Sequence, residues 1–333
     1  MRKVFLIGLF CLSIFSISQA QQEPMFTKYM FNTLIYNPAY AGAKEHLSAT
    51  LLYRNQWVGL DGAPTTQTFS MHSPMKGGRA ALGGSLLHDK VGATRDVKIS
   101  GYYAYRIKFN ETSKLSFGLS ATYNNWRTDW SELQLETPID EAFGSSYSKN
   151  LFNAGVGLFY YNPHFYVGLS VPHLLNGSLV SPDRVVNENE LQAIQIRHYY
   201  LAAGLILPIN TSFVFKPSFL IKNSNLFGEF GANQQSTVGA PTEFDLDLSL
   251  LMYNALWIGV SYRSAFENFS EESSDDSVDL WMAYYLRNNM RIGVSFDYSL
   301  NEIQDVSKGS FEVILGYDFA YKTSKILTPR YFF

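Results

Sequence analysis

The stretch Lys114–Tyr123, KLSFGLSATY, decides the fold of this chain. Its odd-numbered positions carry apolar or aromatic side chains, while its even-numbered positions carry lysine, serine, glycine or threonine. Such strict alternation puts the two kinds of side chain on opposite faces of an extended strand. The same alternation returns at 291–300 and 311–319. These segments predict a sheet that separates an apolar environment from a polar one.

Segments of this kind follow one another along the whole chain. Most are near the 9–11 residues that a tilted strand needs to cross a bilayer. The expected strands are 46–56, 64–73, 79–89, 96–108, 113–125, 151–161, 164–171, 197–207, 211–221, 242–252, 255–263, 277–287, 290–299 and 309–320. Their even number is typical of single-chain bacterial barrels. The predicted fold is all-β, a transmembrane antiparallel β-barrel of about 14 strands with a short N-terminal plug or cap segment.

The connections between these strands alternate in length. The longer ones are 57–63, 90–95, 126–150, 172–196, 222–241, 264–276 and 301–308. The shorter ones are 74–78, 109–112, 162–163, 208–210, 253–254 and 288–289. Outer-membrane barrels have short periplasmic turns and longer outer loops. A soluble β-sandwich gives no reason for such sorting, so the alternation favours a barrel in the outer membrane.

The first twenty residues have the features of a signal peptide. The charged start at Arg2 is followed by an almost wholly apolar run at 4–17 and by small residues up to Ala20. We expect cleavage between Ala20 and Gln21. The single cysteine, Cys11, would leave with this peptide. A mature chain without cysteine has no disulfide, thiolate metal site or cysteine nucleophile.

Composition narrows the function classes further. Charged residues make up 17% of the chain, against roughly 25% in soluble domains, while aromatic residues make up 16%. The formal net charge is −3 and no basic patch stands out, so nucleic acid is not an expected partner. The histidines lack ligand spacing, and the common catalytic motifs are missing. We therefore expect no enzyme activity, no metal site and no cofactor.

Four regions are expected: a signal peptide at 1–20, a periplasmic or plug segment at 21–45, the barrel at 46–320 and a C-terminal tail at 321–333. In lipid, a charge on the polar face of a strand would cost about 2–4 kcal/mol, so such residues are expected to face the lumen. They are Lys98, Arg106, Lys114, Asp245, Asp247, Arg291, Asp297, Glu312 and Asp318. Fourteen strands imply a diameter of roughly 25–30 Å, too wide for wall side chains alone to fill. Water, a ligand or a plug must fill the rest, and 21–45 is the candidate plug.

Three blocks carry a family resemblance. Asn37, Pro38, Ala39, Tyr40, Ala41 and Gly42 follow Tyr29-Met30-Phe31-Asn32; Arg54, Asn55, Gln56 and Trp57 end the first expected strand; and Pro329, Arg330, Tyr331, Phe332 and Phe333 end the chain. Together these blocks resemble the PorP/SprF family of the type IX secretion system of Bacteroidetes. The resemblance covers the whole chain, and the extra Phe333 is the one departure from the usual Arg-Tyr-Phe end.

Each block suggests a role. The Asn37-Pro38-Ala39 segment is either a turn leading into the first strand or part of a plug and partner-docking surface. Arg54 and Trp57 are expected to anchor the barrel at the lipid headgroups. The resemblance implies that the terminal aromatic residues form an assembly signal.

The resemblance implies an outer-membrane component or accessory of type IX secretion. Such a protein would support secretion or surface attachment of specific cargo such as gliding adhesins. Its expected partners are outer-membrane lipid and lipopolysaccharide, other type IX secretion components and secreted adhesin cargo. The alternative is an outer-membrane channel for a hydrophobic or small polar solute, because fatty-acid transporters have the same strand number and an N-terminal plug. Charged inward faces argue against that alternative.

Overall fold

The computed structural model describes residues 29–130, 146–177, 195, 197–224, 242–265 and 277–319. The expected cleavage site at Ala20 and Gln21, the terminal block at 329–333 and most of the three longest connections lie outside these residues. No helix within the described residues is long and apolar enough to cross a membrane.

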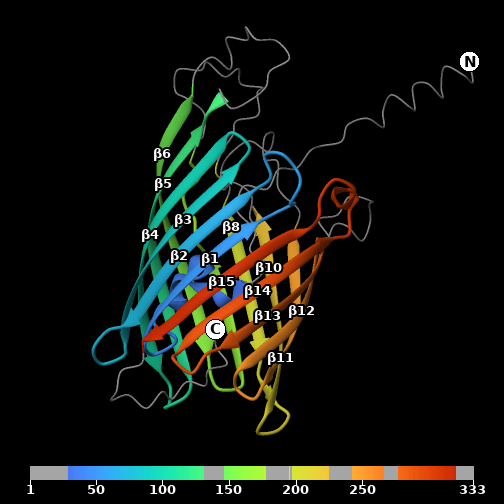
Figure 1. Ribbon diagram of the computed structural model, residues 1–333. Helices are drawn as coiled ribbons and strands as arrows, with labels where there is room; N and C mark the ends of the chain where they lie inside the picture. Colours follow the sequence, from blue (N-terminus) through green and yellow to red (C-terminus); the bar gives the residue numbers. More distant parts are fainter. Residues whose placement is uncertain are drawn as a thin grey trace, which may run out of the picture.

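Within these residues, fourteen antiparallel strands close into a barrel, as the alternation predicts, and one short strand extends the eighth (Figure 1). The strand β15 pairs with β1 from Leu47 opposite Phe319 to Asn55 opposite Phe311, which closes the barrel. The strands are β1 Leu47–Asn55, β2 Thr65–Pro74, β3 Ala80–Val91, β4 Thr94–Lys108, β5 Lys114–Thr128, β6 Tyr147–Tyr161, β7 Phe165–Val171, β8 His198–Leu205, β9 Leu207–Pro208, β10 Phe213–Ser224, β11 Glu243–Met252, β12 Leu256–Ala265, β13 Ser277–Tyr285, β14 Met290–Ser299 and β15 Ser310–Phe319.

The strand expected at 197–207 is interrupted. It ends as β8 at Leu205 and resumes as β9 at Leu207. The backbone N–H of Ile206 between them still donates to the carbonyl of His164 at 2.6 Å, in register with β7, so the break is on the side of β10. The facing strand β10 carries Pro217 at this point. Proline has no N–H for a ladder hydrogen bond. The pairing between these strands therefore stops at Ser218 opposite Gly204 and resumes at Phe215 opposite Leu207.

The connection expected at 90–95 is shorter than predicted. The strands β3 and β4 pair up to Val91 opposite Thr94, which leaves a turn of Gly92 and Ala93 alone. Gly92 has φ 55°, a left-handed conformation that glycine adopts without strain. The strands β4, β5 and β6 also reach 15 residues each, more than a bilayer crossing needs.

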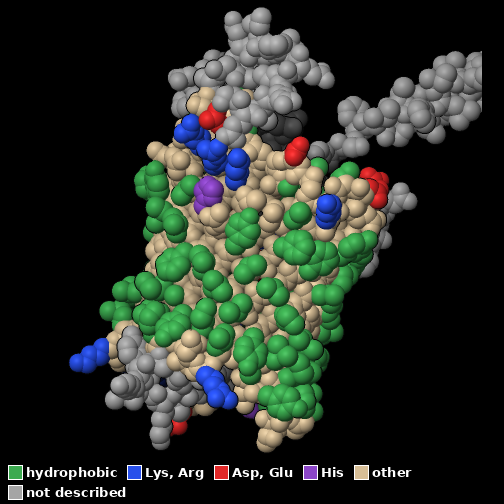
Figure 2. Space-filling model, in the orientation of Figure 1, with side chains coloured by type: hydrophobic (Ala, Val, Ile, Leu, Met, Phe, Trp, Pro, Cys, Tyr) green, Lys and Arg blue, Asp and Glu red, His purple; other side chains and the backbone are tan. Residues whose placement is uncertain are grey.

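Inner and outer faces alternate as the sequence predicts. Figure 2 shows hydrophobic side chains over the outer wall between the two ends of the barrel, with Lys and Arg side chains near the ends. The charged residues expected in the lumen lie on the inner face and are buried there, apart from a partly exposed Asp318: Lys98, Arg106, Lys114, Asp245, Asp247, Arg291, Asp297 and Glu312.

The described part of the expected plug segment forms short helical turns inside the barrel. They are η1 Tyr29–Phe31, α2 Thr33–Tyr36 and η2 Pro38–Tyr40, and a further turn, η6 Glu302–Asp305, lies between β14 and β15. In Figure 1 the first three appear in blue behind β1 and β15. The hydrophobic core consists of these turns and inward-facing wall residues. We refer to residues 29–45 as the plug.

Candidate functional site in the barrel lumen

The plug is fixed to strands on several sides of the lumen. The Tyr29 hydroxyl donates to the Ser218 hydroxyl of β10 at 3.2 Å. On another side, the hydroxyl of Ser170 in β7 donates to the Tyr36 carbonyl at 2.7 Å. Near β2, the amide of Asn32 donates to the Thr68 hydroxyl at 3.0 Å and accepts from Ser70 at 2.7 Å. These bonds pair plug groups that would otherwise be buried without partners.

The Asn37-Pro38-Ala39 block forms the turn η2 against the wall. The Asn37 side-chain oxygen accepts from the Ala39 N–H at 2.9 Å, and Pro38 occupies the first helical position. Asparagine before a helical turn and proline at its start both favour this geometry. The Asn37 amide nitrogen donates to the Leu158 carbonyl of β6 at 2.9 Å and lies 3.4 Å from the Leu169 carbonyl of β7. The block is thus a turn and also part of the plug.

Glycines on three neighbouring strands make room for this block. Gly118 on β5 lies opposite Gly157 on β6, and a Cβ atom at either would collide with it. At Gly118 the colliding atoms belong to the backbone of Pro38 and Ala39. At Gly157 the Asn37 side-chain oxygen is in the way, and at Gly168 on β7 a Cβ would come within 2.9 Å of the Asn37 amide nitrogen. We call Gly118, Gly157 and Gly168 the glycine cradle.

Gly42 is held between β2, β3 and β4. Its N–H donates to the Nδ1 atom of His72 at 2.9 Å, and its carbonyl accepts from the Arg106 guanidinium at 2.5 Å. Its φ is 70°, and a Cβ would lie 2.5 Å from the Cβ of Ala81. Both the backbone conformation and the close approach require glycine here. His72 accepts this hydrogen bond, so its Nδ1 is unprotonated in this arrangement.

Charged side chains connect the end of the plug to the wall. The Lys44 ammonium lies 3.4 Å from the Asp318 carboxylate of β15 and donates to Ser48 at 3.1 Å. Burial, followed by repulsion from Arg291, lowers the pKa of Lys44 to about 8, although Asp318 opposes the shift. The carboxylate of Glu45 pairs with Lys114 of β5. These pairs hold the chain where it enters β1.

Phe31 occupies an aromatic and cationic site on the opposite wall. Its ring meets that of Trp281 on β13 edge to face, with centroids 5.4 Å apart. The Arg291 guanidinium lies 5.2 Å from the Phe31 centroid and 5.8 Å from that of Tyr285. A buried cation over an aromatic face stabilises both by about 0.5–2 kcal/mol.

Arg54 lies in the lumen, so its expected position at the lipid headgroups is wrong. Its guanidinium is 2.6 Å from the Asp297 carboxylate and 3.4 Å from that of Glu312, and the residue is only 2% exposed. Arg54 falls on the inner face of β1 by the same alternation that places its neighbours outside. Gln56 is also buried, with its N–H donating to the Pro64 carbonyl at 2.9 Å. Trp57 lies in the connection after β1, where its N–H donates to Ser310 at 3.1 Å.

A second charge cluster lies on β11, β12 and β13. The guanidinium of Arg263 contacts the two carboxylate oxygens of Asp245 at 2.6 Å and 3.4 Å. Nearby, Asp247 accepts from the Ser261 hydroxyl at 2.7 Å and from the Trp281 indole at 2.8 Å. The described residues contain no group of three His, Cys, Asp or Glu side chains that could hold a metal ion. The clusters are ion pairs and hydrogen bonds within the wall.

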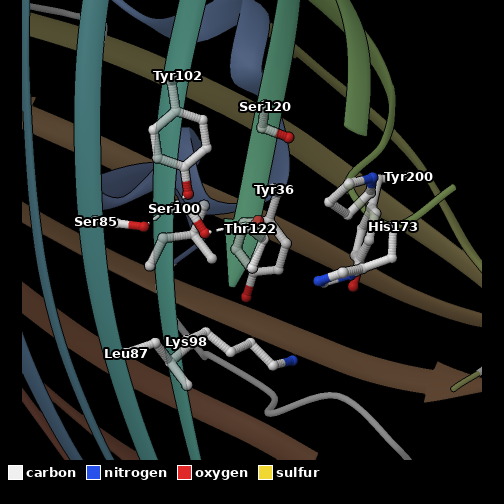
Figure 3. Close-up of a pocket in the computed structure, with 12 residues that line it drawn as sticks. Tyr36, Ser85, Leu87, Lys98, Ser100, Tyr102, Ser120, Thr122, His173 and Tyr200 are labelled. Atoms are coloured by element: carbon white, nitrogen blue, oxygen red, sulfur yellow. Dashed lines mark hydrogen bonds between the residues drawn. The ribbon is translucent and has the colours of Figure 1, made fainter. Parts of the chain in front are cut away.

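A small cavity lined by both polar and apolar side chains lies beside the plug (Figure 3). Tyr36 and Tyr200, with ring centroids 5.1 Å apart, contribute to its lining together with Lys98 and His173. Hydroxyl pairs such as Ser100 and Thr122, at 2.8 Å, complete the wall. The cavity volume is about 40 Å³, enough for a few water-sized groups. Sites for larger organic ligands measure roughly 300–1,000 Å³.

A larger apolar groove of about 410 Å³ lies where the ladder between β8 and β10 is interrupted. Its lining includes outward-facing Val167, Leu205 and Leu248. Tyr166 and Ser218 also line the groove, although they face inward. Ser218 accepts the hydrogen bond from Tyr29, so the plug lies directly behind the groove.

The sequence pointed to the motif residues of the plug, but not to the wall residues that contact them. Glycines at inward positions of strands were the available signal, because a strand glycine often marks a close backbone approach. The wall residues His72 and Arg106 gave no comparable signal as plug contacts, since the sequence does not reveal which wall positions face which plug residues.

A closed barrel with an apolar outer wall, and with charged wall residues and a plug in its interior, defines an outer-membrane β-barrel protein. The profile of the type IX secretion system membrane protein family PorP/SprF matches residues 18–317 of the chain. The chain therefore belongs to the PorP/SprF family and is located in the outer membrane. No curated protein matches the chain.

Solved barrels resemble the chain only distantly. The CymD monoaromatic hydrocarbon channel shares 15% identity with a TM-score of 0.49, covering 92% of this chain and 95% of its own. A Pseudomonas aeruginosa FadL homologue shares 12% identity with a TM-score of 0.48, covering 92% and 97%. Acinetobacter baumannii Omp33 shares 9% identity with a TM-score of 0.44, covering 84% and 100%.

Proposed function

We propose that the protein is a non-catalytic outer-membrane component of type IX secretion that supports secretion or surface attachment of specific cargo, such as gliding adhesins. Membership of the PorP/SprF family supports a role in this system. The observation that carries the finer proposal is the plug. Its hydrogen bonds to β2, β6, β7 and β10 fix it inside the lumen, which favours a binding scaffold over a conduit.

The family blocks have structural roles in this proposal. The polar groups of Asn37 already bond to the wall and to Ala39, which leaves little capacity for a partner. Gly42 and Arg54 are likewise engaged inside the barrel. Partner docking then belongs to the long connections at one end of the barrel. A protein–protein interface of ordinary size buries roughly 800 Å² of surface on each of the two proteins. Connections of this length can provide such an area.

Export follows the route expected from the sequence. The signal peptide is removed after Ala20, and the aromatic end at Tyr331, Phe332 and Phe333 directs barrel insertion. N-terminal sequencing of protein from the outer-membrane fraction should begin at Gln21. Recovery of a chain that still begins at Met1 would contradict this step.

The test of function is a comparison of surface and medium proteomes. A deletion strain should lose one or a few surface proteins, and the full chain should restore them. A chain with residues 131–145 and 178–194 replaced by short linkers should assemble but fail to restore them. Slower migration after boiling shows that this shortened barrel is folded. An unchanged surface proteome with slower growth on one carbon source would instead support a solute channel.

The groove between β8 and β10 is the observation that favours the channel alternative, because it is an apolar recess in the wall. Planar-bilayer conductance separates the two functions. If the protein is a binding scaffold, the purified full chain should not conduct ions, whereas a chain lacking residues 29–41 should conduct them. Steady conductance of the full chain would support the channel.

A further inference from the structure

The outer wall is hollowed where β8 and β10 separate. These strands pair at Ser218 opposite Gly204 and again at Phe215 opposite Leu207, and the register is the same on both sides of the interruption. No residue is inserted, so the interruption is not a β-bulge. The strands instead separate at Pro217 and rejoin below it, which opens a recess in the wall.

A small side chain deepens this recess on the lipid-facing side. Ala203 faces outward on β8, opposite Val167 of β7 on one side and Phe219 of β10 on the other. Phe219 is in turn opposite Leu246 of β11. A methyl group therefore lies among large apolar side chains in one row across four strands. This row and the separated strands below it line the apolar groove of about 410 Å³, which we call the β8–β10 groove.

The groove lies at the depth of acyl chains in the periplasmic leaflet. Pro217 is four residues after Phe213, where β10 begins. Tilted strands rise roughly 2.5 Å per residue, so the groove is roughly 10–15 Å above that strand end. Tyr253 is 72% exposed and packs on Phe213 with ring centroids 5.4 Å apart, as suits the headgroup level. Because short turns face the periplasm and half of the hydrocarbon core is roughly 15 Å thick, the groove faces the inner-leaflet chains.

The floor of the groove is backed by the plug. Tyr166 and Ser218 line the groove from the inner face of the wall. The Tyr166 ring covers Gly204, where a Cβ atom would be only 2.6 Å from a ring carbon. Ser218 accepts the hydrogen bond from Tyr29 of the plug at 3.2 Å. A ligand that enters from the bilayer therefore meets a closed floor and stays in the wall.

The occupant of such a groove must be apolar and must come from the bilayer. At its rim, Leu205 and Leu248 are each 50% exposed and continue the lipid-facing wall. An empty recess would deprive its lining of dispersion contacts. An apolar cavity of about 150 Å³ holds a benzene molecule, so about 410 Å³ holds roughly a dozen carbon atoms. Much of one phospholipid acyl chain fits that space.

We propose that the β8–β10 groove binds one acyl chain of a phospholipid from the periplasmic leaflet. The chain rises from the headgroup level near Tyr253 and lies against Ala203, between Val167 and Phe219. Binding comes from burial of apolar surface, so it depends on the length of the chain and not on the headgroup. The site is independent of the proposed secretion role, because the lipid stays outside the lumen and away from the long connections.

Lipid retention by the purified full chain in detergent tests the proposal. The chain is mixed with dipalmitoyl phosphatidylethanolamine, and bound lipid is measured by native mass spectrometry. Ala203→Phe fills the groove with a ring and should weaken retention at least about tenfold. The matched control is Ala121→Phe, the same change at an outward position where the ladders of β4, β5 and β6 are uninterrupted. This control should bind as the wild type does.

A second variant acts on the backbone of the groove. Pro217→Val supplies the N–H that proline lacks and suits a strand, so β8 and β10 can pair through this point and narrow the groove. It should also weaken lipid retention. Heat-dependent gel migration shows which variants are folded, and Pro217→Val decides the test if Ala203→Phe does not fold.

Comparison ligands separate the acyl chain from the headgroup. Dihexanoyl phosphatidylethanolamine should bind at least about tenfold more weakly, whereas dipalmitoyl phosphatidylcholine should bind equally well. Undiminished retention by the folded groove variants would overturn the proposal. Equal loss in Ala203→Phe and Ala121→Phe would also overturn it, because the lipid would then be bound all around the wall. Tighter binding of free palmitate than of the phospholipid would overturn it in favour of a solute site.

Discussion

Gly118 and Gly157 lie directly opposite each other on β5 and β6, and the Asn37-Pro38-Ala39 block occupies the space that their missing side chains leave. The block could not approach the wall this closely if either position carried a Cβ atom. Its hydrogen bond from Asn37 to the Leu158 carbonyl depends on that approach. The fit between wall and plug therefore depends on close approach of the plug to the backbone of β5 and β6.

The first prediction concerns this match. In Gly118→Ala the new methyl group collides with the backbone of Pro38 and Ala39, and overpacking of this kind costs about 1–3 kcal/mol. Urea unfolding in detergent should show the loss. Gly101→Ala on β4 is the control, because a Cβ there meets nothing within 4 Å. Equal stability of the two variants would mean that the plug does not depend on the glycine cradle.

A second prediction concerns the Arg54 cluster. Arg54→Met leaves Asp297 and Glu312 buried on the inner face without their guanidinium. Removing one partner of a buried ion pair costs about 3–5 kcal/mol. Arg54→Lys keeps the positive charge and should recover part of that loss. If Arg54→Met unfolds at the same urea concentration as the wild type, the cluster does not stabilise the barrel.

The sequence predicted the barrel because alternation is a local signal that each strand carries by itself. The same signal placed charged residues such as Lys98 and Glu312 correctly on the inner face. Arg54 also follows this alternation, which places it on the inner face. It was nevertheless expected at the lipid headgroups, because it was grouped with Trp57, a residue type that is common there. The break at Ile206 was missed because it depends on Pro217 of the facing strand. The plug contacts depend on which wall residues face which plug residues across the lumen. A single sequence contains no local pattern that reveals these long-range pairs.

The third prediction tests the outer face. Leu119 is 58% exposed near the middle of β5, and Leu119→Arg would place a charge in the hydrocarbon core. The expected loss is about 2–4 kcal/mol if the site is at the midplane. Gln67→Arg is also on an outward position, but it lies only two residues from the end of β2 and opposite the polar His88, and it should be tolerated. The measurement is folding yield into liposomes and urea stability. Similar losses for both variants would mean that Leu119 does not lie deeper in the bilayer than Gln67.

The last prediction fixes the orientation of the barrel in the membrane. The sequence contains only Cys11, within the expected signal peptide, so a single introduced cysteine is a clean reporter in the mature chain. Asp61 lies in the connection between β1 and β2, and Asn288 lies in the short turn between β13 and β14, at the opposite end. Because short turns face the periplasm in outer-membrane barrels, Asp61→Cys should react with a membrane-impermeant maleimide on intact cells. Asn288→Cys should react only after the outer membrane is permeabilised. The reverse pattern would mean that the connection between β1 and β2 faces the periplasm.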